Sequence, residues 1–107
     1  MGVVLINSLN EFNGILHANK NVVVDIFASW CGPCKVIKPK FVQLEQKYSK
    51  FITFCSVDID NVNDFAEEYR VNVLPTFLFF NNSELFDKLE GANYDKLVNI
   101  LSKMTNI

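Results

Sequence analysis

The fold of this chain is decided by the stretch Val22-Val23-Val24-Asp25-Ile26-Phe27-Ala28-Ser29-Trp30-Cys31-Gly32-Pro33-Cys34-Lys35. Residues 22–28 are apolar apart from Asp25, a composition typical of a central strand that is covered on both faces. Pro33 favours the first turn of a helix, where its missing N–H group is not needed. The stretch therefore predicts a strand that leads directly into a helix, with Cys31 and Cys34 at the turn between them.

The rest of the chain alternates between strand and helix patterns. Besides residues 22–28, apolar runs predict strands at residues 3–6, 51–57, 76–80 and 84–90. Apolar residues at helical spacing predict helices that include residues 9–16, 37–48, 62–69 and 94–101. This order predicts an α/β fold, with a central mixed five-stranded sheet flanked by four helices.

Local signals mark where the helices begin and bend. Ser8 and Glu11 form the pattern of a capping box, and Asn93 can cap the last helix after the chain break at Gly91. Pro39 lies inside the second helix and should kink it, because proline removes a backbone hydrogen bond. The turn Asn81-Asn82-Ser83 predicts a hairpin between the last two strands.

Length, charge and cysteine count limit the function classes. The 107 residues fit one domain that spans residues 1–107. The 10 basic and 12 acidic side chains form no basic stripe, so we expect neither nucleic acid nor a membrane as a partner. Three cysteines, an odd number, argue against a secreted disulfide scaffold, and the apolar start is too short for a signal peptide. We therefore expect a soluble intracellular protein.

The cysteine pair suits thiol–disulfide exchange, which needs one thiolate to attack and a second thiol to resolve the mixed disulfide. We expect Cys31 at the exposed cap of the helix, where free N–H groups and the helix dipole stabilise a thiolate. Cys34 should lie one turn further in and shielded. Cys31 is therefore the predicted nucleophile and Cys34 the predicted resolving thiol. Gly32 gives the backbone room to turn, and Pro33 restricts it.

Two other interpretations of the pair stay open at this stage. A structural zinc site needs four ligands, and the chain has only this one pair, which Cys55 and His17 could complete only by a coincidence of folding. The pair could also be two core cysteines without a function. The position between a strand and a helix favours the redox interpretation over both.

Asp25 is the second candidate for chemistry. A carboxylate among buried neighbours is costly, so its pKa should rise, and it could then accept the proton of Cys34 directly or through water. The alternative is an aspartate at the end of the sheet that is satisfied by backbone donors.

The motif Trp30-Cys31-Gly32-Pro33-Cys34-Lys35, after a strand with a central aspartate, resembles the thioredoxin family. Residues 71–77, with their Pro-Thr pair, and residues 90–93 resemble the family as well, so the similarity covers nearly the whole chain. It implies the thioredoxin fold and a protein-disulfide reductase that works through Cys31 and Cys34, with a buried Asp25 handling the proton. It also implies no bound metal or cofactor, electrons from NADPH through a separate thioredoxin reductase, disulfide-containing protein substrates, and a cytoplasmic monomer.

The resemblance also suggests where substrates dock. It implies a cis peptide bond at Pro75 that faces the cysteines and leaves the backbone of Leu74 free to pair with an extended segment. Trp30 would be a platform beside the thiols, although a core aromatic is the alternative, just as Pro75 could simply begin a strand. The residues expected to contact substrate are Trp30, Gly32, Pro33, Leu74, Pro75 and Gly91.

Two positions depart from the family pattern or lie outside it. Many bacterial members carry a lysine near Asp25 on the third strand, where this chain has Ser56. Cys55 is expected to be a buried structural thiol, with regulatory oxidation as the alternative. Other functions stay open too: a disulfide oxidase or isomerase, against which Gly32-Pro33 argues because it is typical of reducing members, and a binding subunit without turnover.

Overall fold

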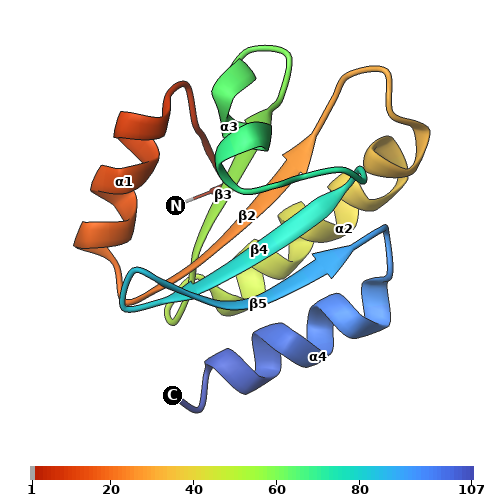
Figure 1. Cartoon of the computed structure of the whole chain (residues 1–107). Helices are drawn as coiled ribbons and strands as arrows, with labels where there is room; N and C mark the ends of the chain where they lie inside the picture. Colours follow the sequence, from red (N-terminus) through yellow and green to blue (C-terminus); the bar gives the residue numbers. More distant parts are fainter. Residues whose placement is uncertain (1) are drawn as a thin grey trace.

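A computed structural model describes residues 2–107 and contains five strands and four helices (Figure 1). The strands are β1 (Val4–Leu5), β2 (Asn21–Phe27), β3 (Thr53–Asp58), β4 (Thr76–Asn81) and β5 (Glu84–Glu90). The helices are α1 (Leu9–Ala18), α2 (Gly32–Tyr48), α3 (Asn63–Glu68) and α4 (Tyr94–Met104).

The strands form a mixed sheet in the order β1-β3-β2-β4-β5, with β2 at its centre. The neighbours β1, β3 and β2 run parallel, whereas β4 is antiparallel to both β2 and β5. Parallel strands need a crossover connection. Helix α1 connects β1 to β2 over one face of the sheet, and α2 connects β2 to β3 over the other face. The predicted five-stranded α/β architecture is confirmed.

Alternate residues of β2 face two separate hydrophobic layers. Val23 packs with the buried faces of α2 and α4, including Phe41 and Leu101. Val22, Val24 and Ile26 pack into the other layer, which contains residues of α1 and α3. Figure 1 shows these two pairs of helices on opposite faces of the sheet. Both faces of β2 are therefore covered, which explains its almost uninterrupted apolar sequence.

Capping side chains fix the helix starts that the sequence predicts. The Ser8 hydroxyl accepts a hydrogen bond from Glu11 N–H at 3.0 Å, and the Asn93 side chain accepts one from Lys96 N–H at 3.0 Å. Glu11 Oε1 reaches back to the N–H of Asn7 at 2.8 Å, one residue earlier than in a standard capping box. α2 continues through Pro39 to Tyr48, so the proline does not end it.

Some boundaries differ from the sequence prediction. The third strand begins at Thr53 rather than at residue 51, because the N–H groups of Phe51 and Ile52 bond to Tyr48 O at the end of α2. The first strand is only two residues long, Val4–Leu5. α3 is also short, six residues, and begins without a side-chain cap.

The end of the sheet near the β4–β5 hairpin carries a buried amide network. Asn21, the first residue of β2, is 6% exposed. Its Nδ2 donates to Phe51 O at 3.4 Å and to Met104 O at 3.5 Å, and its Oδ1 accepts from Asn81 Nδ2 at 2.8 Å. This network joins β2 to β4, to the turn that follows α2 and to the last residue of α4.

Candidate active site

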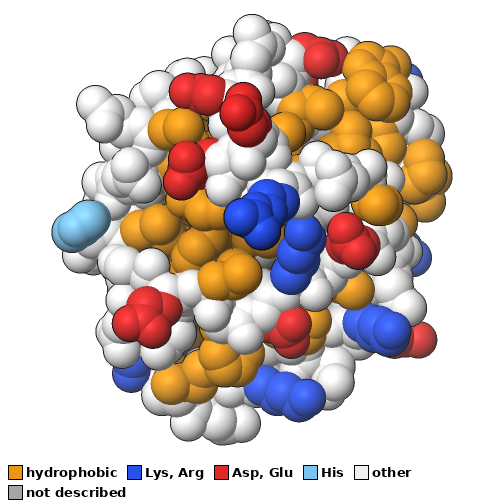
Figure 2. Space-filling model, viewed as in Figure 1, with side chains coloured by type: hydrophobic (Ala, Val, Ile, Leu, Met, Phe, Trp, Pro, Cys, Tyr) orange, Lys and Arg blue, Asp and Glu red, His pale blue; other side chains and the backbone are white. Residues whose placement is uncertain are grey.

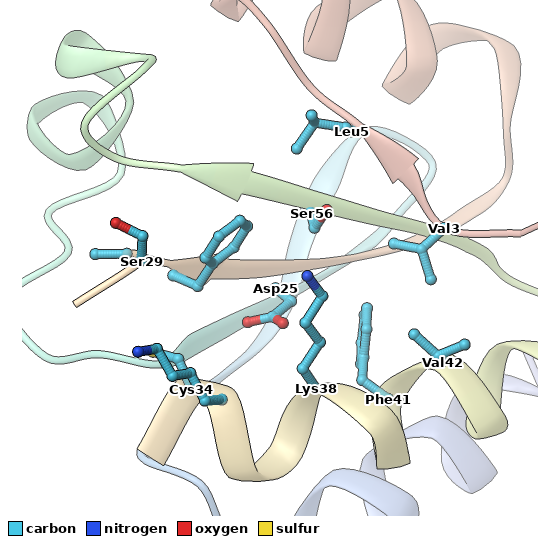
Figure 3. A pocket seen from close by; sticks show the side chains of 12 residues that line it. Val3, Leu5, Asp25, Ser29, Cys34, Lys38, Phe41, Val42 and Ser56 are labelled. Carbon is cyan, nitrogen blue, oxygen red and sulfur yellow. The ribbon is translucent and has the colours of Figure 1, made fainter. Parts of the chain in front are cut away.

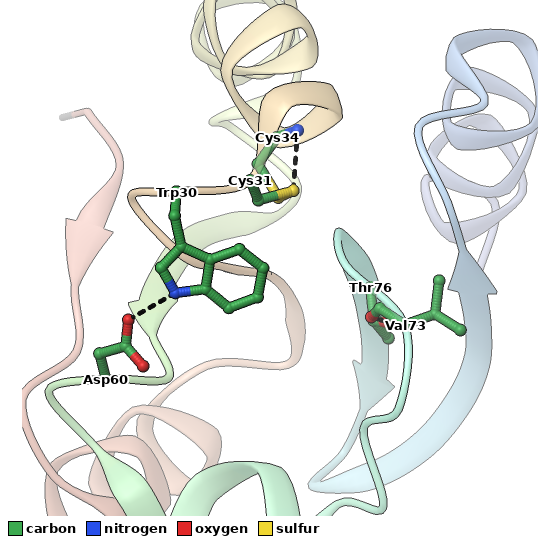
Figure 4. Close-up of a disulfide and its surroundings, with 6 residues drawn as sticks. All are labelled: Trp30, Cys31, Cys34, Asp60, Val73 and Thr76. Atoms are coloured by element: carbon green, nitrogen blue, oxygen red, sulfur yellow. Dashed lines mark hydrogen bonds between the residues drawn. A yellow bond between two sulfur atoms is a disulfide. The ribbon is translucent and has the colours of Figure 1, made fainter.

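Cys31 and Cys34 lie at the opposite end of β2, where the chain turns into α2, and they form a disulfide (Figure 4). Cys31 is the N-cap residue of α2, and its Sγ accepts a hydrogen bond from the N–H of Cys34 at 3.2 Å. The sulfur of Cys31 therefore sits at the positive end of the helix dipole. When the disulfide is reduced, this position stabilises a thiolate on Cys31.

The predicted exposure of Cys31 is wrong for the disulfide form. Cys31 is 5% exposed, hardly more than Cys34 at 3%. Cys31 and Cys34 form a buried cluster with Ala28, and Ile59 and Leu74 pack against this cluster. The helix therefore distinguishes the two cysteines by capping geometry rather than by solvent exposure.

A groove of about 470 Å³ opens beside the disulfide. Trp30, 67% exposed, borders it, and its Nε1–H donates to Asp60 Oδ2 at 2.9 Å (Figure 4). The alternative of a core tryptophan is therefore wrong. The groove is lined by Trp30, Cys31, Gly32, Pro33, Ile59, Val71, Asn72 and Leu74.

The far wall of the groove is the segment before β4. The Leu74–Pro75 peptide bond is cis, as the resemblance implied. Leu74 lines the groove, whereas Pro75 and Gly91 are not among the residues that line it. Gly91 N–H donates to Pro75 O at 2.8 Å, so the two residues are joined to each other directly after Leu74. Gly91 has a φ of +94°, a backbone conformation that favours glycine at this link. Thr76 Oγ1 donates to Val73 O and ties the segment to the start of β4 (Figure 4).

The surface around this groove is partly apolar. Trp30 and Val73 are both exposed, at 67% and 42%. Figure 2 shows hydrophobic side chains gathered over the loop between β2 and α2, while acidic and basic side chains are scattered over the rest of this face. Such a patch beside a reactive disulfide suits contact with another protein.

Asp25 is buried in the centre of the sheet, between Ser56 of β3 and Phe77 of β4. It is 3% exposed, and its Oδ1 has no hydrogen-bond partner. Burial raises its pKa from 3.8 to about 7, and the positive charge of Lys38 acts in the opposite direction. The alternative of a carboxylate satisfied by backbone donors therefore fails for Oδ1. A carboxyl with a pKa near neutrality can both take and give a proton.

A second cavity brings Asp25 and Cys34 together. It has a volume of about 600 Å³ and lies between α2 and the strands β1, β2 and β3 (Figure 3). Asp25, Cys34, Lys38 and Ser56 all line it. The sequence predicted the roles of Asp25 and Cys34 but missed Lys38, although Lys38 follows Cys34 by four residues and so lies on the same helix face.

The remaining cysteine lies elsewhere. Cys55 is a free thiol in β3, fully buried, and burial raises its pKa to about 12. His17, the other residue considered for a zinc site, lies on α1, with its Nδ1 at 2.9 Å from Asn13 O. Residues 2–107 contain no group of three or more His, Cys, Asp or Glu side chains that could hold a metal ion.

In the same part of the chain, no helix is both long and apolar enough to cross a membrane.

A redox-active pair at a strand-to-helix turn, on a mixed five-stranded sheet, defines a thiol–disulfide oxidoreductase. Comparison with known proteins gives the family. The chain belongs to the thioredoxin family, whose model, described as "Thioredoxin", matches residues 3–103. The chain is 46% identical over 94 residues to the thioredoxin of Equus caballus. This alignment covers 86% of this chain and 89% of the relative.

Solved structures of similar chains show the same fold. The structure of Plasmodium falciparum thioredoxin has a TM-score of 0.90 and 38% identity, and the alignment covers 94% of this chain and 98% of that one. A structure from work on thiol resolution in yeast mitochondrial 1-Cys peroxiredoxin by glutathione and thioredoxin systems also has a TM-score of 0.90. It is 32% identical, with 94% of each chain covered. Like its relatives, this chain is a protein-disulfide oxidoreductase.

Proposed function

We propose that the protein works mainly as a reductant of disulfides in other proteins, with Cys31 as the nucleophile. The observation that carries this proposal is the cap geometry: Cys31 Sγ is the atom that accepts the N–H of Cys34 at the start of α2. A thiolate at Cys31 attacks one sulfur of the substrate disulfide. The substrate S–S bond breaks, a mixed disulfide forms, and the released substrate thiolate takes up a proton.

Cys34 then resolves the mixed disulfide. Its thiol gives its proton to Asp25, directly or through water in the cavity that both residues line. The Cys34 thiolate attacks Cys31 Sγ, forms the Cys31–Cys34 disulfide and releases the second substrate thiolate. Two electrons pass from the cysteine pair to the substrate, and Asp25 can return the proton to the product.

Substrates dock, in this proposal, at the groove beside the disulfide. An extended segment of the partner lies against the Trp30 ring and the backbone of Leu74, in the manner of an added strand. Gly32 and Pro33 also line the groove and would contact the segment, and the bond from Gly91 N–H to Pro75 O steadies the chain next to Leu74. The apolar surface around Trp30 supplies the contact area.

The electron source and working form are also part of the proposal. A separate thioredoxin reductase restores the dithiol with electrons from NADPH. The chain acts as a single domain, residues 1–107, and as a monomer in the cytoplasm, without nucleic acid or membrane partners. Peroxiredoxins are candidate substrates, because one similar solved structure comes from work on such an enzyme.

A coupled assay tests this function. The protein is mixed with a thioredoxin reductase, NADPH and insulin, and NADPH oxidation and insulin precipitation are followed together. We expect NADPH consumption that depends on this protein and on insulin, and a Cys55→Ala variant with unchanged rates as the control. A protein that the reductase reduces but that leaves insulin disulfides intact would contradict the reductant role. A redox potential close to those of oxidising relatives would favour the oxidase or isomerase alternative.

A further inference from the structure

The cavity between α2 and the strands is much larger than a proton transfer from Cys34 to Asp25 requires. One bridging water occupies about 30 Å³ of liquid volume, whereas the cavity measures about 600 Å³. That volume lies within the range of sites that hold a small organic molecule, and such sites have mostly apolar walls. The apolar side chains that line this cavity are Val3, Leu5, Phe27, Ala28, Phe41 and Val42.

The mouth of the cavity is apolar and open to solvent. Leu5 of β1 and Val42 of α2 both line the cavity and are both exposed, so they belong to its rim. Figure 3 shows these two side chains on opposite sides of the space. Between them, β3 contributes Ser56, whose side chain is short and leaves the space unfilled. An apolar molecule can therefore enter without separating β1 from β3.

The positive charge in this cavity comes from α2. Lys35 and Lys38 both line it, and Figure 3 shows the Lys38 side chain rising from the helix beside Asp25. The Lys38 Nζ lies 5.8 Å from the centre of the Phe27 ring, and within residues 2–107 it forms no ion pair. An ammonium group beside apolar walls, without an ion-pair partner, can bind an anionic group through charge-assisted hydrogen bonds.

The acidic group of the cavity does not cancel this charge below neutral pH. Burial raises the pKa of Asp25 to about 7, so its carboxyl is largely protonated at about pH 6. Cys34 is held in the disulfide in the oxidised protein. The strands that face Asp25 contribute uncharged side chains: Leu5 of β1, Ser56 of β3 and Phe77 of β4.

We propose that this cavity binds a small amphipathic carboxylate, a molecule with an apolar body and one anionic end. The apolar body lies against Leu5, Phe41 and Val42, and the carboxylate accepts hydrogen bonds from the Lys38 ammonium group. The charge selects an anion over a neutral or cationic molecule with the same apolar body.

Occupancy of the cavity has a consequence for the disulfide chemistry. Asp25 and Cys34 line the same space, so a bound molecule displaces the water between them. The step in which Cys34 resolves the mixed disulfide should then slow, whereas the attack by Cys31 should not. This consequence rests on the proposed role of Asp25 as proton acceptor, but binding itself does not.

Calorimetry of the oxidised protein at about pH 6 tests binding, with octanoate as the probe. Octanol and octylammonium carry the same apolar chain with a neutral and a cationic end. We expect one saturable octanoate site, octanol binding that is weaker by about fivefold, and no octylammonium binding. In amide NMR spectra, the largest shifts on addition of octanoate should fall on Leu5, Val42 and Ser56.

Variants with matched controls locate the site. Val42→Glu places a negative charge at the mouth and should weaken octanoate binding by at least about tenfold. Val36→Glu, also exposed on α2 but outside the cavity lining, should bind like the wild type. Lys38→Gln should weaken binding by about fivefold, whereas Lys40→Gln, whose Nζ lies 5.0 Å from the centre of the Tyr94 ring, should not. Ser56→Met should fill the space and abolish binding.

Three results would overturn the inference: no saturable octanoate binding, octanol that binds as tightly as octanoate, or equal effects of Val42→Glu and Val36→Glu. Stopped-flow reduction of dithiobis(nitrobenzoic acid) separates this inference from the proposed function. Its first phase reports the attack by Cys31, and its second reports resolution by Cys34. If octanoate binds at this site but leaves the second phase unchanged, the site stands and the proton route through Asp25 fails.

Discussion

The two ends of β2 bury polar side chains in opposite ways. At one end Asn21 is 6% exposed, and its amide bonds to backbone oxygens and to Asn81. Four residues further along the same strand, Asp25 is 3% exposed, and its Oδ1 has no hydrogen-bond partner. The disulfide lies at the end of β2 that Asp25 approaches.

The comparison distinguishes a buried polar side chain that stabilises the structure from one that is available for chemistry. A buried amide that is fully bonded fixes the geometry of its neighbours at little cost. A buried carboxyl without a partner destabilises the folded state whenever it is charged, and such groups cluster at functional sites. Asn21 therefore holds the ends of the sheet and helices together, whereas in the proposed function Asp25 exchanges a proton with Cys34 in the cavity that both line.

The largest effect should come from the cysteines at the Asp25 end. Cys31→Ser removes the thiolate that we propose as the nucleophile, so disulfide reduction should fall to the uncatalysed background in an insulin assay. Cys34→Ser should keep the attack and accumulate mixed disulfides, visible as adducts by mass spectrometry. Cys55→Ser removes a thiol remote from the groove and serves as the control. An active Cys31→Ser protein would refute the assignment of the nucleophile.

The next largest effect concerns stability and its pH dependence. The pKa of Asp25 is about 7 in the folded protein, whereas the pKa of an unperturbed aspartate is 3.8. Between these pH values the unfolded chain therefore loses a proton that the folded protein keeps. Stability therefore falls with rising pH across this window and levels off above it. Asp25→Asn removes this penalty and should stabilise the oxidised protein by up to roughly 4 kcal/mol above neutral pH.

Denaturant unfolding at several pH values measures this gain. The difference between Asp25→Asn and the wild type should shrink toward zero below about pH 4, where the unfolded chain also holds its proton. A gain that is the same at every pH would show that packing, rather than the charge, causes it.

An effect of opposite sign is expected at the other end of the strand. Asn21→Ala leaves the amide of Asn81 and two backbone oxygens without their partner, so the free energy of unfolding should fall by about 2–3 kcal/mol. The insulin-reduction rate at a temperature where the variant is folded should stay at the wild-type value. An Asn21→Ala variant that is folded but has lost activity would contradict the view that Asn21 serves stability alone.

The smallest effect should come from the exposed rim of the groove. Asp60→Ala removes the acceptor for Trp30 Nε1–H and frees the ring to move. Because the pair is exposed, stability should change by less than about 1 kcal/mol, and KM for a protein disulfide should rise about threefold with kcat unchanged. Asp64→Ala, another exposed acidic residue after β3, is the control.

Most of the fold followed from patterns that are local in the sequence. The apolar run before Trp30, the caps at Ser8 and Asn93 and the Asn82-Ser83 turn each predict structure within a few residues. Boundaries were less accurate, because Phe51 and Ile52 look like strand residues but complete hydrogen bonds at the end of α2.

The site was predicted in part. Cys31, Cys34 and Asp25 could be named as candidates because each is an unusual residue in its local pattern, and the structure brings them close to one another. Lys38, Ile59, Val71 and Asn72 were missed, because they belong to the site only through segments that the fold brings together. The exposure of Cys31 was also wrong, since the packing around a closed disulfide is a tertiary property.

Cys55 gives the molecule a built-in reporter. Once Cys31 and Cys34 are joined, it carries the chain's remaining thiol, buried at the centre of β3 between Val4 and Val24. An alkylating reagent can reach that sulfur only when the sheet opens. The rate at which Cys55 of the oxidised protein is alkylated therefore reports how often the sheet opens, and the measurement needs no dye or engineered residue.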